Sequence, residues 1–379
     1  METYRIGFVL EQALGHKTHA QNLKFILEQQ NVIQPHWILP DWQTDGWLGR
    51  LPFLRSNWTM HAGLQAKFGL KAIGNKIHLD GLFFHTQVPA VINTGSVRRY
   101  PTVISLDATP LQYDQLGNAY QHKIGPEWLE AVKTRLNRDC FHAARHLVTW
   151  SHWAKNSLME NYSVPEEKIT VISPGVDVST WKRPMQTNHQ AGVVKILFVG
   201  GDFTRKGGED LLMAFQLLKA KRVTTSNGPR LELHMVTQTP LQGGIDIYIY
   251  PHMQPNSPAL KQLYYDADIF CLPSHGDCLP MALAEAGAAG LPLVSTRMAA
   301  IPELVQEQVN GLLIEPGNIP QLVEVLDHLI DDPQLRQAMG QQSRRIVVEE
   351  HSVIDNANRL IHLICSSLDN VTTQRIAYA

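Results

Sequence analysis

The feature that most constrains this chain is a regular alternation of two kinds of segment. Short runs rich in β-branched and aromatic residues are separated by longer segments in which apolar residues recur every three or four positions. This alternation indicates an α/β fold with parallel sheets buried on both faces by helices. The expected strands are Tyr4–Leu10, His36–Leu39, Gly81–His85, Thr102–Leu106, His146–Trp150, Ile169–Ile172, Lys195–Val199, Leu231–Val236, Ile245–Tyr250, Asp268–Leu272 and Leu293–Ser295, and the expected helices include Leu211–Leu218 and Leu322–Ile330.

The alternation stops once, in a polar segment from Trp181 to Gly192, and then starts again. A chain of 379 residues is long enough for two domains. We therefore expect two doubly wound Rossmann-like domains, 1–184 and 185–355, and a C-terminal helix, 356–379, with the option of returning to the N-terminal domain. Ligands of such domains bind at the carboxyl ends of the parallel strands, so the chemistry is expected in strand-to-helix loops.

The composition excludes several classes of protein. Hydrophobic residues make up 44% and charged residues 18%, which excludes a disordered or fibrous chain. With 33 Lys and Arg against 35 Asp and Glu, the net charge of -2 argues against a nucleic-acid-binding protein. The four cysteines form no CxxC pair, so neither a zinc site nor a disulfide framework is indicated. No apolar stretch is long enough to span a membrane or to form a signal peptide, and we expect a cytoplasmic protein.

The most informative segment runs from Cys271 to Thr296. An expected strand is followed by a loop of Pro, Ser and Gly, and a helix of small residues is predicted to begin near Pro280. Asp277 in the loop and Glu285 eight residues later could hold two hydroxyl-bearing parts of one ligand, while amides at the helix start could hold an anion. For the pair alone, the alternative is a loop Asp that caps the helix and a solvated Glu.

This segment resembles the donor-site signature of the retaining glycosyltransferases of family 4. That signature has an acidic residue, seven intervening positions, Glu-Ala, and then Gly-x-Pro before a strand. Further motifs follow in the family's order, which makes the resemblance more specific than one motif would be. It is strong over residues 145–345 and looser over 1–145. The additional motifs are Val148–Ser151, Lys168–Asp177, Leu197–Gly207, Ala267–Ser274 and Gly311–Gly317.

The resemblance implies a GT-B fold, in which two Rossmann-like domains face each other across a cleft. It implies a hexosyltransferase-type enzyme that moves a sugar from a nucleotide-sugar donor to a glycan, lipid or small-molecule acceptor with retention of the anomeric configuration. The first expectation for the donor is a UDP- or GDP-sugar, with no cofactor besides this substrate and no metal. Polysaccharide or glycolipid biosynthesis is the implied setting, while the sugar, the acceptor, the linkage and the oligomeric state stay open.

The resemblance also implies roles for residues of the second domain. Glu285 matches the glutamate that binds the ribose hydroxyls, and Asp277 stands where the family usually has a Glu that contacts the donor sugar. Arg205 and Lys206 match the basic loop that neutralises the diphosphate, where fixed cations would stabilise the charge of the leaving group. The other expected donor-binding residues are Gly200, Gly201, Thr204, Cys278, Leu279, Pro280, which has no N–H to donate, and Met281.

Some positions of the second domain depart from the family pattern. Asp277 is one methylene shorter than the usual Glu, which leaves the donor sugar undefined. Gly201 stands where the family has an Arg, so one cation is missing, and Arg205 is the candidate substitute. Cys278 occupies a position where the family commonly has Gly.

The first domain matches the family less closely. Gly15-His-Lys-Thr-His19 resembles the glycine-rich loop near the diphosphate and acceptor, with a plain turn and a surface His as the alternative. Where the family often has His-Asp, this chain has Leu106 before Asp107. His85, at the end of its expected strand, is either a cleft-facing residue or a satisfied core histidine. We expect the acceptor near Gly15, His19, His85 and Asp107.

Residues 46–79 contain no Asp or Glu, and their Lys and Arg residues are interleaved with Trp and Phe. This pattern suits peripheral contact with an anionic membrane surface on its inner face. The alternative is a helix buried in the first domain with its basic side chains extended into solvent. The formal DxD of Asp266 and Asp268 matches a structural Ala-Asp of the family, and no metal-ligand spacing occurs elsewhere, so no metal site is expected.

Two other functions are compatible with the same architecture, because a fold does not fix a function. One is a nucleotide-sugar epimerase or sugar phosphorylase, which would need further acid and base groups around the sugar. The other is a non-catalytic nucleotide-sugar-binding subunit that works with a partner, which the missing Arg after Gly200 and the Leu at position 106 would favour. Product formation with and without an added acceptor distinguishes the enzyme classes.

Overall fold

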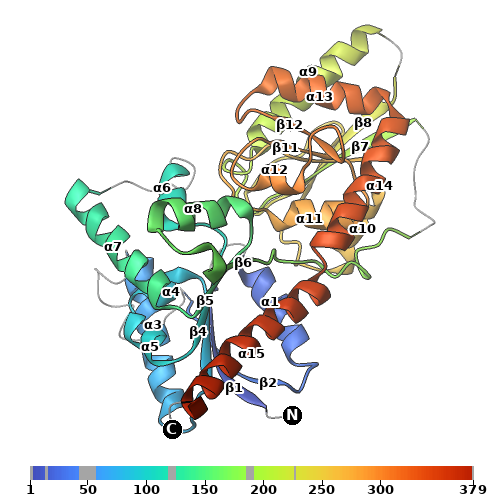
Figure 1. Ribbon diagram of the computed structural model, residues 1–379. Helices are drawn as coiled ribbons and strands as arrows, with labels where there is room; N and C mark the ends of the chain where they lie inside the picture. The colour runs from blue at the N-terminus through green and yellow to red at the C-terminus, as the bar shows by residue number, and fades with distance from the viewer. Residues whose placement is uncertain are drawn as a thin grey trace. The chain divides into compact units, whose positions relative to one another are not determined.

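The computed structural model describes residues 3–12, 16–41, 57–117, 125–184, 192–225 and 228–377, and its chain divides into two compact units (Figure 1). The first unit joins the described residues up to Pro174 with those from Val353 onward. The second unit runs from Gly175 to Ser352. The chain therefore passes between the units twice.

Both boundaries lie earlier in the chain than the sequence predicts. The first does so because the segment 175–184 packs on the second unit. The buried Trp181 ring meets the ring of Tyr264 edge-on, with 5.0 Å between their centroids. The Arg183 guanidinium donates a hydrogen bond of 2.6 Å to the carbonyl oxygen of Ala267. These contacts assign the segment to the second unit.

The first unit is built on a parallel sheet of six strands in the order β2-β1-β3-β4-β5-β6. The strand order reverses at β1, so the carboxyl ends of β1 and β3 flank the switch point at which ligands of open α/β sheets bind. The strands are β1 (Tyr4–Leu10), β2 (Ile33–Ile38), β3 (Gly81–His85), β4 (Thr102–Leu106), β5 (His146–Thr149) and β6 (Ile169–Val171). The helices are α1 (His16–Leu27), α3 (Trp58–Gly74), α4 (Gln87–Val91), α5 (Thr94–Arg99), α6 (Pro110–Gln115), α7 (Glu127–Ala143), α8 (His152–Tyr162) and the C-terminal α15 (Val353–Ala377).

Successive residues of each strand face opposite sides of this sheet, and both sides are apolar. Phe84 belongs to one core cluster together with Ala66 of α3 and Phe141 of α7. Phe83 belongs to the other cluster, in which Leu360 of α15 takes part. Helix α15 therefore covers one face of the sheet, beside α1, as Figure 1 shows in red and blue. The burial of both faces explains the continuous apolar strands of the sequence.

The second unit has a parallel sheet of six strands in the order β12-β11-β10-β7-β8-β9. The strands are β7 (Val193–Val199), β8 (Arg230–Val236), β9 (Ile247–Tyr250), β10 (Ile269–Leu272), β11 (Leu293–Thr296) and β12 (Gly311–Ile314). The helices are α9 (Gly208–Thr225), α10 (Pro258–Asp266), α11 (Met281–Ala288), α12 (Ile301–Leu304), α13 (Ile319–Asp331) and α14 (Pro333–Glu350).

Strand β12 is absent from the strands expected from the sequence, where its residues stand out only as part of a family motif. The strand has four residues, and a Leu-Leu-Ile run of this length does not distinguish a strand from a buried turn of helix. The α/β class is confirmed for both units. Among the helices of the described residues, none combines the length and apolar character needed to cross a membrane.

Candidate active site

Two loops of the second unit meet at the carboxyl ends of the neighbouring strands β7 and β10. The Arg205 guanidinium, in the loop after β7, donates a hydrogen bond of 2.6 Å to the carbonyl oxygen of Gly276, in the loop after β10. The backbone oxygen of Arg205 accepts a hydrogen bond of 2.9 Å from the backbone N–H of His275. Arg205 therefore fixes one loop against the other.

Gly207 explains how closely these loops approach. Its φ is +76°, a left-handed conformation that favours glycine, and a Cβ added there would lie 1.8 Å from the carbonyl oxygen of Pro273. Gly201, in the same loop, has only one neighbouring heavy atom, at 3.9 Å from such a Cβ. The close approach of the two loops therefore requires a glycine at position 207 but not at position 201.

The cations of the first loop are paired with carboxylates. Lys206 Nζ forms a short ion pair with Asp277, and the exposed fractions of the two side chains are 16% and 12%. Arg205 Nε donates a hydrogen bond of 3.1 Å to Asp202. Both cations are therefore already positioned by a carboxylate. An anion that binds here would replace that carboxylate as the partner of the cation.

Glu285 is the fifth residue of α11, and it is buried with 7% of its surface exposed. Its Oε2 accepts a hydrogen bond of 2.8 Å from the Tyr264 hydroxyl of α10. Burial raises the pKa of Glu285 to about 6, although the Tyr264 hydrogen bond and the Lys261 charge both favour the ionised form. A solvated Glu, the alternative reading of the sequence, is wrong.

The other predicted donor-binding residues line the same loops in different environments. Cys278, Leu279 and Pro280 are buried, and Met281, the first residue of α11, is half-buried. The carbonyl oxygen of Cys278 accepts a hydrogen bond of 3.1 Å from the Ala300 N–H, so the loop before α11 is fixed by the backbone. For these four positions, the structure leaves their roles toward a donor as predictions.

The loop after β7 adds three predicted positions. A Cβ on Gly200 would lie 2.9 Å from Cβ of Lys206, so this position accepts only a small residue without displacement of Lys206. The Thr204 hydroxyl donates a hydrogen bond of 2.9 Å to Glu209, at the start of α9. Sequence reasoning missed the His275–Asp210 pair, which joins the loop after β10 to the first turn of α9 at 2.8 Å between Nε2 and Oδ2. A histidine inside the donor-site motif was the available signal.

In the first unit, polar side chains follow four adjacent strands at the same edge of the sheet. Glu11 follows β1, His85 ends β3, Asp107 follows β4, and Trp150 follows β5. The structure therefore brings together His85 and Asp107, two of the predicted residues, at the switch point of the sheet. Gly15 lies outside the described residues.

Histidine rings form the centre of this edge. His16 Nδ1 lies 3.0 Å from His85 Nε2, and His16 Nε2 lies 3.9 Å from Asp107 Oδ2. The His85 ring stacks on Trp150 at 5.2 Å between centroids and 11° between planes. His19 of α1 lies beside both rings, at 4.8 Å from His85 and 5.0 Å from Trp150. His16, which sequence reasoning did not select, connects Asp107 to His85.

Two of these histidines are neutral at physiological pH. Burial, with a smaller contribution from the His16 charge, lowers the pKa of His19 to about 3. Burial also lowers the pKa of His85 well below its usual value, with His19 and His16 adding to the effect. Among the described residues, His85 Nδ1 and His19 Nε2 find no hydrogen-bond partner. His85 is thus a core histidine that is not fully satisfied.

Carboxylates flank the rings and are held by neutral donors. Asp107 accepts hydrogen bonds from the Tyr113 hydroxyl at 2.7 and 2.9 Å to its two oxygens. Glu11, which is buried, accepts a 2.6 Å hydrogen bond from the Thr86 hydroxyl and a short one from Trp58 Nε1. Glu11 carried no motif in the sequence, and its position directly after β1 was the only signal.

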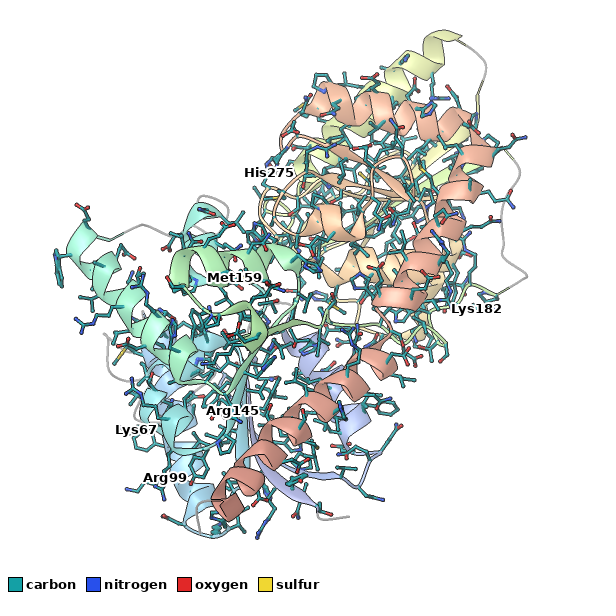
Figure 2. All side chains as sticks on the ribbon, viewed as in Figure 1. Lys67, Arg99, Arg145, Met159, Lys182 and His275 are labelled. Atoms are coloured by element: carbon teal, nitrogen blue, oxygen red, sulfur yellow. The ribbon has the colours of Figure 1, made fainter. Side chains whose placement is uncertain are left out.

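Only the part of 46–79 from Asn57 onward is described, and most of it forms α3. One face of this helix is buried, whereas Lys67, Phe68 and Lys71 are exposed. Lys67 extends away from the ribbon on the same side of the molecule as Arg99 of α5 (Figure 2). The helix thus has a buried apolar face and an exposed basic face, as both sequence interpretations require.

Asp268 has a structural partner. Its Oδ2 accepts a hydrogen bond of 2.8 Å from the backbone N–H of Lys195, at the start of the sheet of the second unit. Within the described ranges, no group of three or more His, Cys, Asp and Glu residues is arranged to hold a metal ion.

Comparison with solved structures identifies the fold. A sucrose-phosphate synthase from Thermosynechococcus elongatus superposes with a TM-score of 0.74 at 14% identity, over 99% of this chain and 100% of that one. HepE of Anabaena, solved in complex with UDP-glucose, superposes with a TM-score of 0.66 at 16% identity, over 96% of this chain and 99% of that one. Two parallel α/β units of this kind define a protein with the GT-B fold.

Sequence comparison gives two matches to family models. Residues 19–180 match the family model described as Glycosyltransferase Family 4, and residues 179–346 match Glycosyl transferases group 1. Each match covers less than half of the chain, and the two together span most of it.

Curated relatives match a smaller part. A D-inositol 3-phosphate glycosyltransferase of Arthrobacter sp. is 28% identical over 202 residues, 48% of this chain and 47% of that protein. An uncharacterized glycosyltransferase of Haemophilus influenzae is 31% identical over 165 residues, 42% of this chain and 45% of that protein. The chain thus spans about half the length of these relatives.

Proposed function

We propose that this chain transfers a glycosyl group from a nucleotide-sugar donor, a UDP- or GDP-sugar, to a hydroxyl of an acceptor, with retention of the anomeric configuration and without a metal ion. The observation that carries the proposal is the contact of two loops at the carboxyl ends of β7 and β10. Arg205 and Lys206 of one loop bond to Gly276 and Asp277 of the other, and α11, which follows the second loop, contains the buried Glu285. The two glycosyltransferase family models that the chain matches and the UDP-glucose bound by HepE support it.

On this proposal, donor binding rearranges the Lys206–Asp277 pair. A diphosphate draws the Lys206 ammonium toward its oxygens, because two phosphate charges outweigh one carboxylate. Asp277 then becomes free to accept a hydrogen bond from a hydroxyl of the donor sugar. Arg205 stays in place through its bond to Gly276 and adds a second cation. As the diphosphate leaves, both cations stabilise its growing charge.

Glu285 binds the ribose of the nucleotide on this proposal. The Tyr264 hydroxyl donates to one oxygen of its carboxylate and so orients the group. The other oxygen is then the acceptor for a ribose hydroxyl. With a pKa of about 6, the carboxyl is ionised above that pH and accepts charge-assisted hydrogen bonds.

The histidine cluster of the first unit is proposed to orient the acceptor. The C–O bond between the anomeric carbon and the diphosphate breaks, and the acceptor oxygen bonds to the same face of that carbon. The acceptor proton passes to a phosphate oxygen of the leaving nucleoside diphosphate. His16, His85 and Asp107 hold the acceptor hydroxyl through hydrogen bonds, and α3 places the protein on an anionic membrane when the acceptor is a lipid.

The test is calorimetric titration of the full chain with UDP-, GDP- and ADP-sugars, with magnesium and with a chelator. We expect one donor to bind in both conditions, and Glu285→Ala to weaken it about a hundredfold, because a charge-assisted hydrogen bond contributes about 1.5–3 kcal/mol. Glu315→Ala is the matched control, since this carboxylate of the same unit is 63% exposed. Unchanged donor affinity in a folded Glu285→Ala protein contradicts the assignment.

Turnover is tested separately with the donor identified in this way. NMR of the product gives the anomeric configuration, and an inverted product contradicts retention. Product that forms without any acceptor indicates an epimerase, and donor binding without turnover indicates a partner-dependent subunit.

A further inference from the structure

A pocket lies in the first unit, between the β5–β6 edge of the sheet and helix α15. Its volume is ≈ 470 Å³, which suits a small ligand. Arg145 lies beside α15 in the view of Figure 2. The lining residues are Arg145, His146, Thr170, Ile172, Arg359, His362, Leu363, Ser366 and Ser367, and none of them is acidic.

The positive charges of this pocket lack negative partners. The ion pairs of the described residues include none with Arg145, Arg359 or the neighbouring Lys168. Lys168 Nζ donates instead to a backbone oxygen, that of His142, at 2.6 Å. Burial and the nearby Arg145 charge lower the pKa of Lys168, which indicates that like charges are crowded here. Crowding of unpaired cations is costly unless an anion joins them.

Arg359 is oriented by neutral groups. Its guanidinium donates to the Asn356 side-chain oxygen at 3.2 Å and to the Val171 carbonyl oxygen at 3.1 Å. Asn356 is fixed in turn, because its amide donates at 3.0 Å to the Ser173 carbonyl oxygen. These bonds set the direction of the guanidinium and leave its charge uncompensated, which is an arrangement suited to a bound anion.

The acidic residues of α15 do not supply the missing charge. Asp355 and Asp369 belong to this helix, but neither lines the pocket. The Asp369 carboxylate accepts a short hydrogen bond from the Tyr4 hydroxyl. Thr170 and the serines are occupied within the protein, since Ser367 Oγ donates to the Leu363 carbonyl oxygen at 2.7 Å. The charged donors to a ligand are therefore Arg145 and Arg359, and the His362 ring lies in the same pocket.

We infer that this pocket binds a phosphate group carried by a ligand, at a site separate from the loops after β7 and β10. Two exposed arginines line this one pocket, and a guanidinium can donate two parallel hydrogen bonds to phosphate oxygens. The volume leaves room for a small organic part. The phosphate belongs either to a free phosphate ester or to the headgroup of an anionic lipid. Because Arg359 and Asn356 hold residues 171–173, directly before the chain leaves the first unit, the ligand also braces this crossing segment.

The experiment measures binding of inorganic phosphate and glycerol 3-phosphate to the full chain by calorimetry, with the ring protons of His146 and His362 followed by NMR. We expect Arg145→Gln to lower the affinity about tenfold, as expected for the loss of one charge-assisted contact of about 1.4 kcal/mol, and Arg145→Gln with Arg359→Gln to abolish it. Arg145→Gln is the safer variant, because within the described residues its guanidinium makes no hydrogen bond to the protein.

Two controls locate the anion. Lys182→Gln with Arg297→Gln removes the same charge from exposed positions of the second unit and is expected to leave binding unchanged. Lys206→Gln removes a cation of the donor loop and is likewise expected to leave the His362 shifts unchanged. Phosphate binding that is lost only in Lys206→Gln overturns the inference, because the anion then occupies the donor loop.

The lipid source is tested with vesicles of phosphatidylcholine, with and without phosphatidylglycerol. Binding that requires phosphatidylglycerol and is lost in Arg145→Gln with Arg359→Gln, when free esters do not bind, assigns the pocket to a lipid headgroup. Binding of free esters with the same mutational loss assigns it to a soluble phosphate ester. Equal binding by wild type and the double variant with both kinds of probe overturns the inference.

Discussion

The candidate sites of the two units occupy the same place in their sheets but differ in their chemistry. In the second unit, Arg205 and Lys206 pair with the carboxylates Asp202 and Asp277 around loops that the backbone fixes. In the first unit, the neutral His85 ring stacks on Trp150 and both are buried at the strand ends, while the half-buried His19 ring of α1 lies tilted beside them. The site of the second unit consists of ion-paired side chains, whereas the site of the first unit consists of uncharged rings that can form hydrogen bonds.

This difference has a physical consequence for ligands. Ion pairs that are partly buried exchange their partner for a stronger anion at little desolvation cost, because the cations are already out of bulk water. Neutral imidazoles hold a hydroxyl group without attracting an anion. The four predictions below test this contrast, from the largest expected effect to the smallest.

The largest effect is expected where the two loops of the second unit touch. Gly207→Ala places a Cβ 1.8 Å from the Pro273 carbonyl oxygen at a φ of +76°, so the loop has to move. We expect a loss of about 3 kcal/mol or more in the free energy of unfolding, together with the loss of donor binding. Urea unfolding measures the first quantity and calorimetry the second.

Gly201→Ala is the control for this change, since its added Cβ meets only one atom, at 3.9 Å. We expect its stability to remain within about 0.5 kcal/mol of the wild type. If both variants are equally stable, the close approach of the two loops is not what holds the site together.

The second prediction concerns acidification of the first unit. Burial lowers the pKa of His19 from 6.5 to about 3, so below pH 6.5 the unfolded chain binds a proton that the folded unit refuses. The free energy of unfolding therefore falls as the pH falls, by about 2–3 kcal/mol over two pH units, and His85 adds to this loss. Hydrogen exchange of the β3 amides measures it. His19→Gln removes the His19 share of the slope and leaves that of His85, while His78→Gln, at an exposed position, keeps the whole slope.

The third prediction has the opposite sign in the second unit. Burial raises the pKa of Glu285 from 4.5 to about 6, so between these values the folded unit binds a proton that the unfolded chain has released. Acidification from pH 6 to 4.5 therefore raises the contribution of Glu285 to stability, by about 1.3 kcal/mol. Exchange of the β10 amides in wild type and Glu285→Gln isolates this contribution. Equal slopes in the two proteins would show that Glu285 is not a buried acid.

The two sites also differ in how far the sequence predicts them. Asp277 and Glu285 lie in one contiguous motif, whose spacing is preserved because a single strand-loop-helix unit carries both residues. The fold class and eleven of the strand positions follow from the same kind of local pattern. What the sequence did not reveal for Glu285 was its burial, since Tyr264, its partner, comes from another helix.

The site of the first unit is assembled from separate strand ends, and the sequence predicts it only in part. Leu106, in place of the family histidine, is buried in a core cluster, while His16 approaches Asp107 from the start of α1. No local spacing relates His16 to His85, because their contact depends on the strand order of the sheet. Residues that meet only through topology carry no motif, and for that reason Glu11 and His16 were missed.

The smallest effect is expected for Tyr264→Phe, which removes the hydroxyl that donates to Glu285 and keeps the ring packed against Trp181. The hydrogen bond favours the ionised carboxylate, so its loss raises the pKa of Glu285 further and weakens donor binding at neutral pH by a factor of about five, or about 1 kcal/mol. The midpoint of donor affinity against pH measures the shift. Tyr265→Phe is the matched control on the same helix, since its hydroxyl donates to the Thr180 carbonyl oxygen at 2.6 Å and not to Glu285. If the two variants move the midpoint equally, the Tyr264 bond does not set the charge of Glu285, and the contrast between the two units then rests on the ion pairs alone.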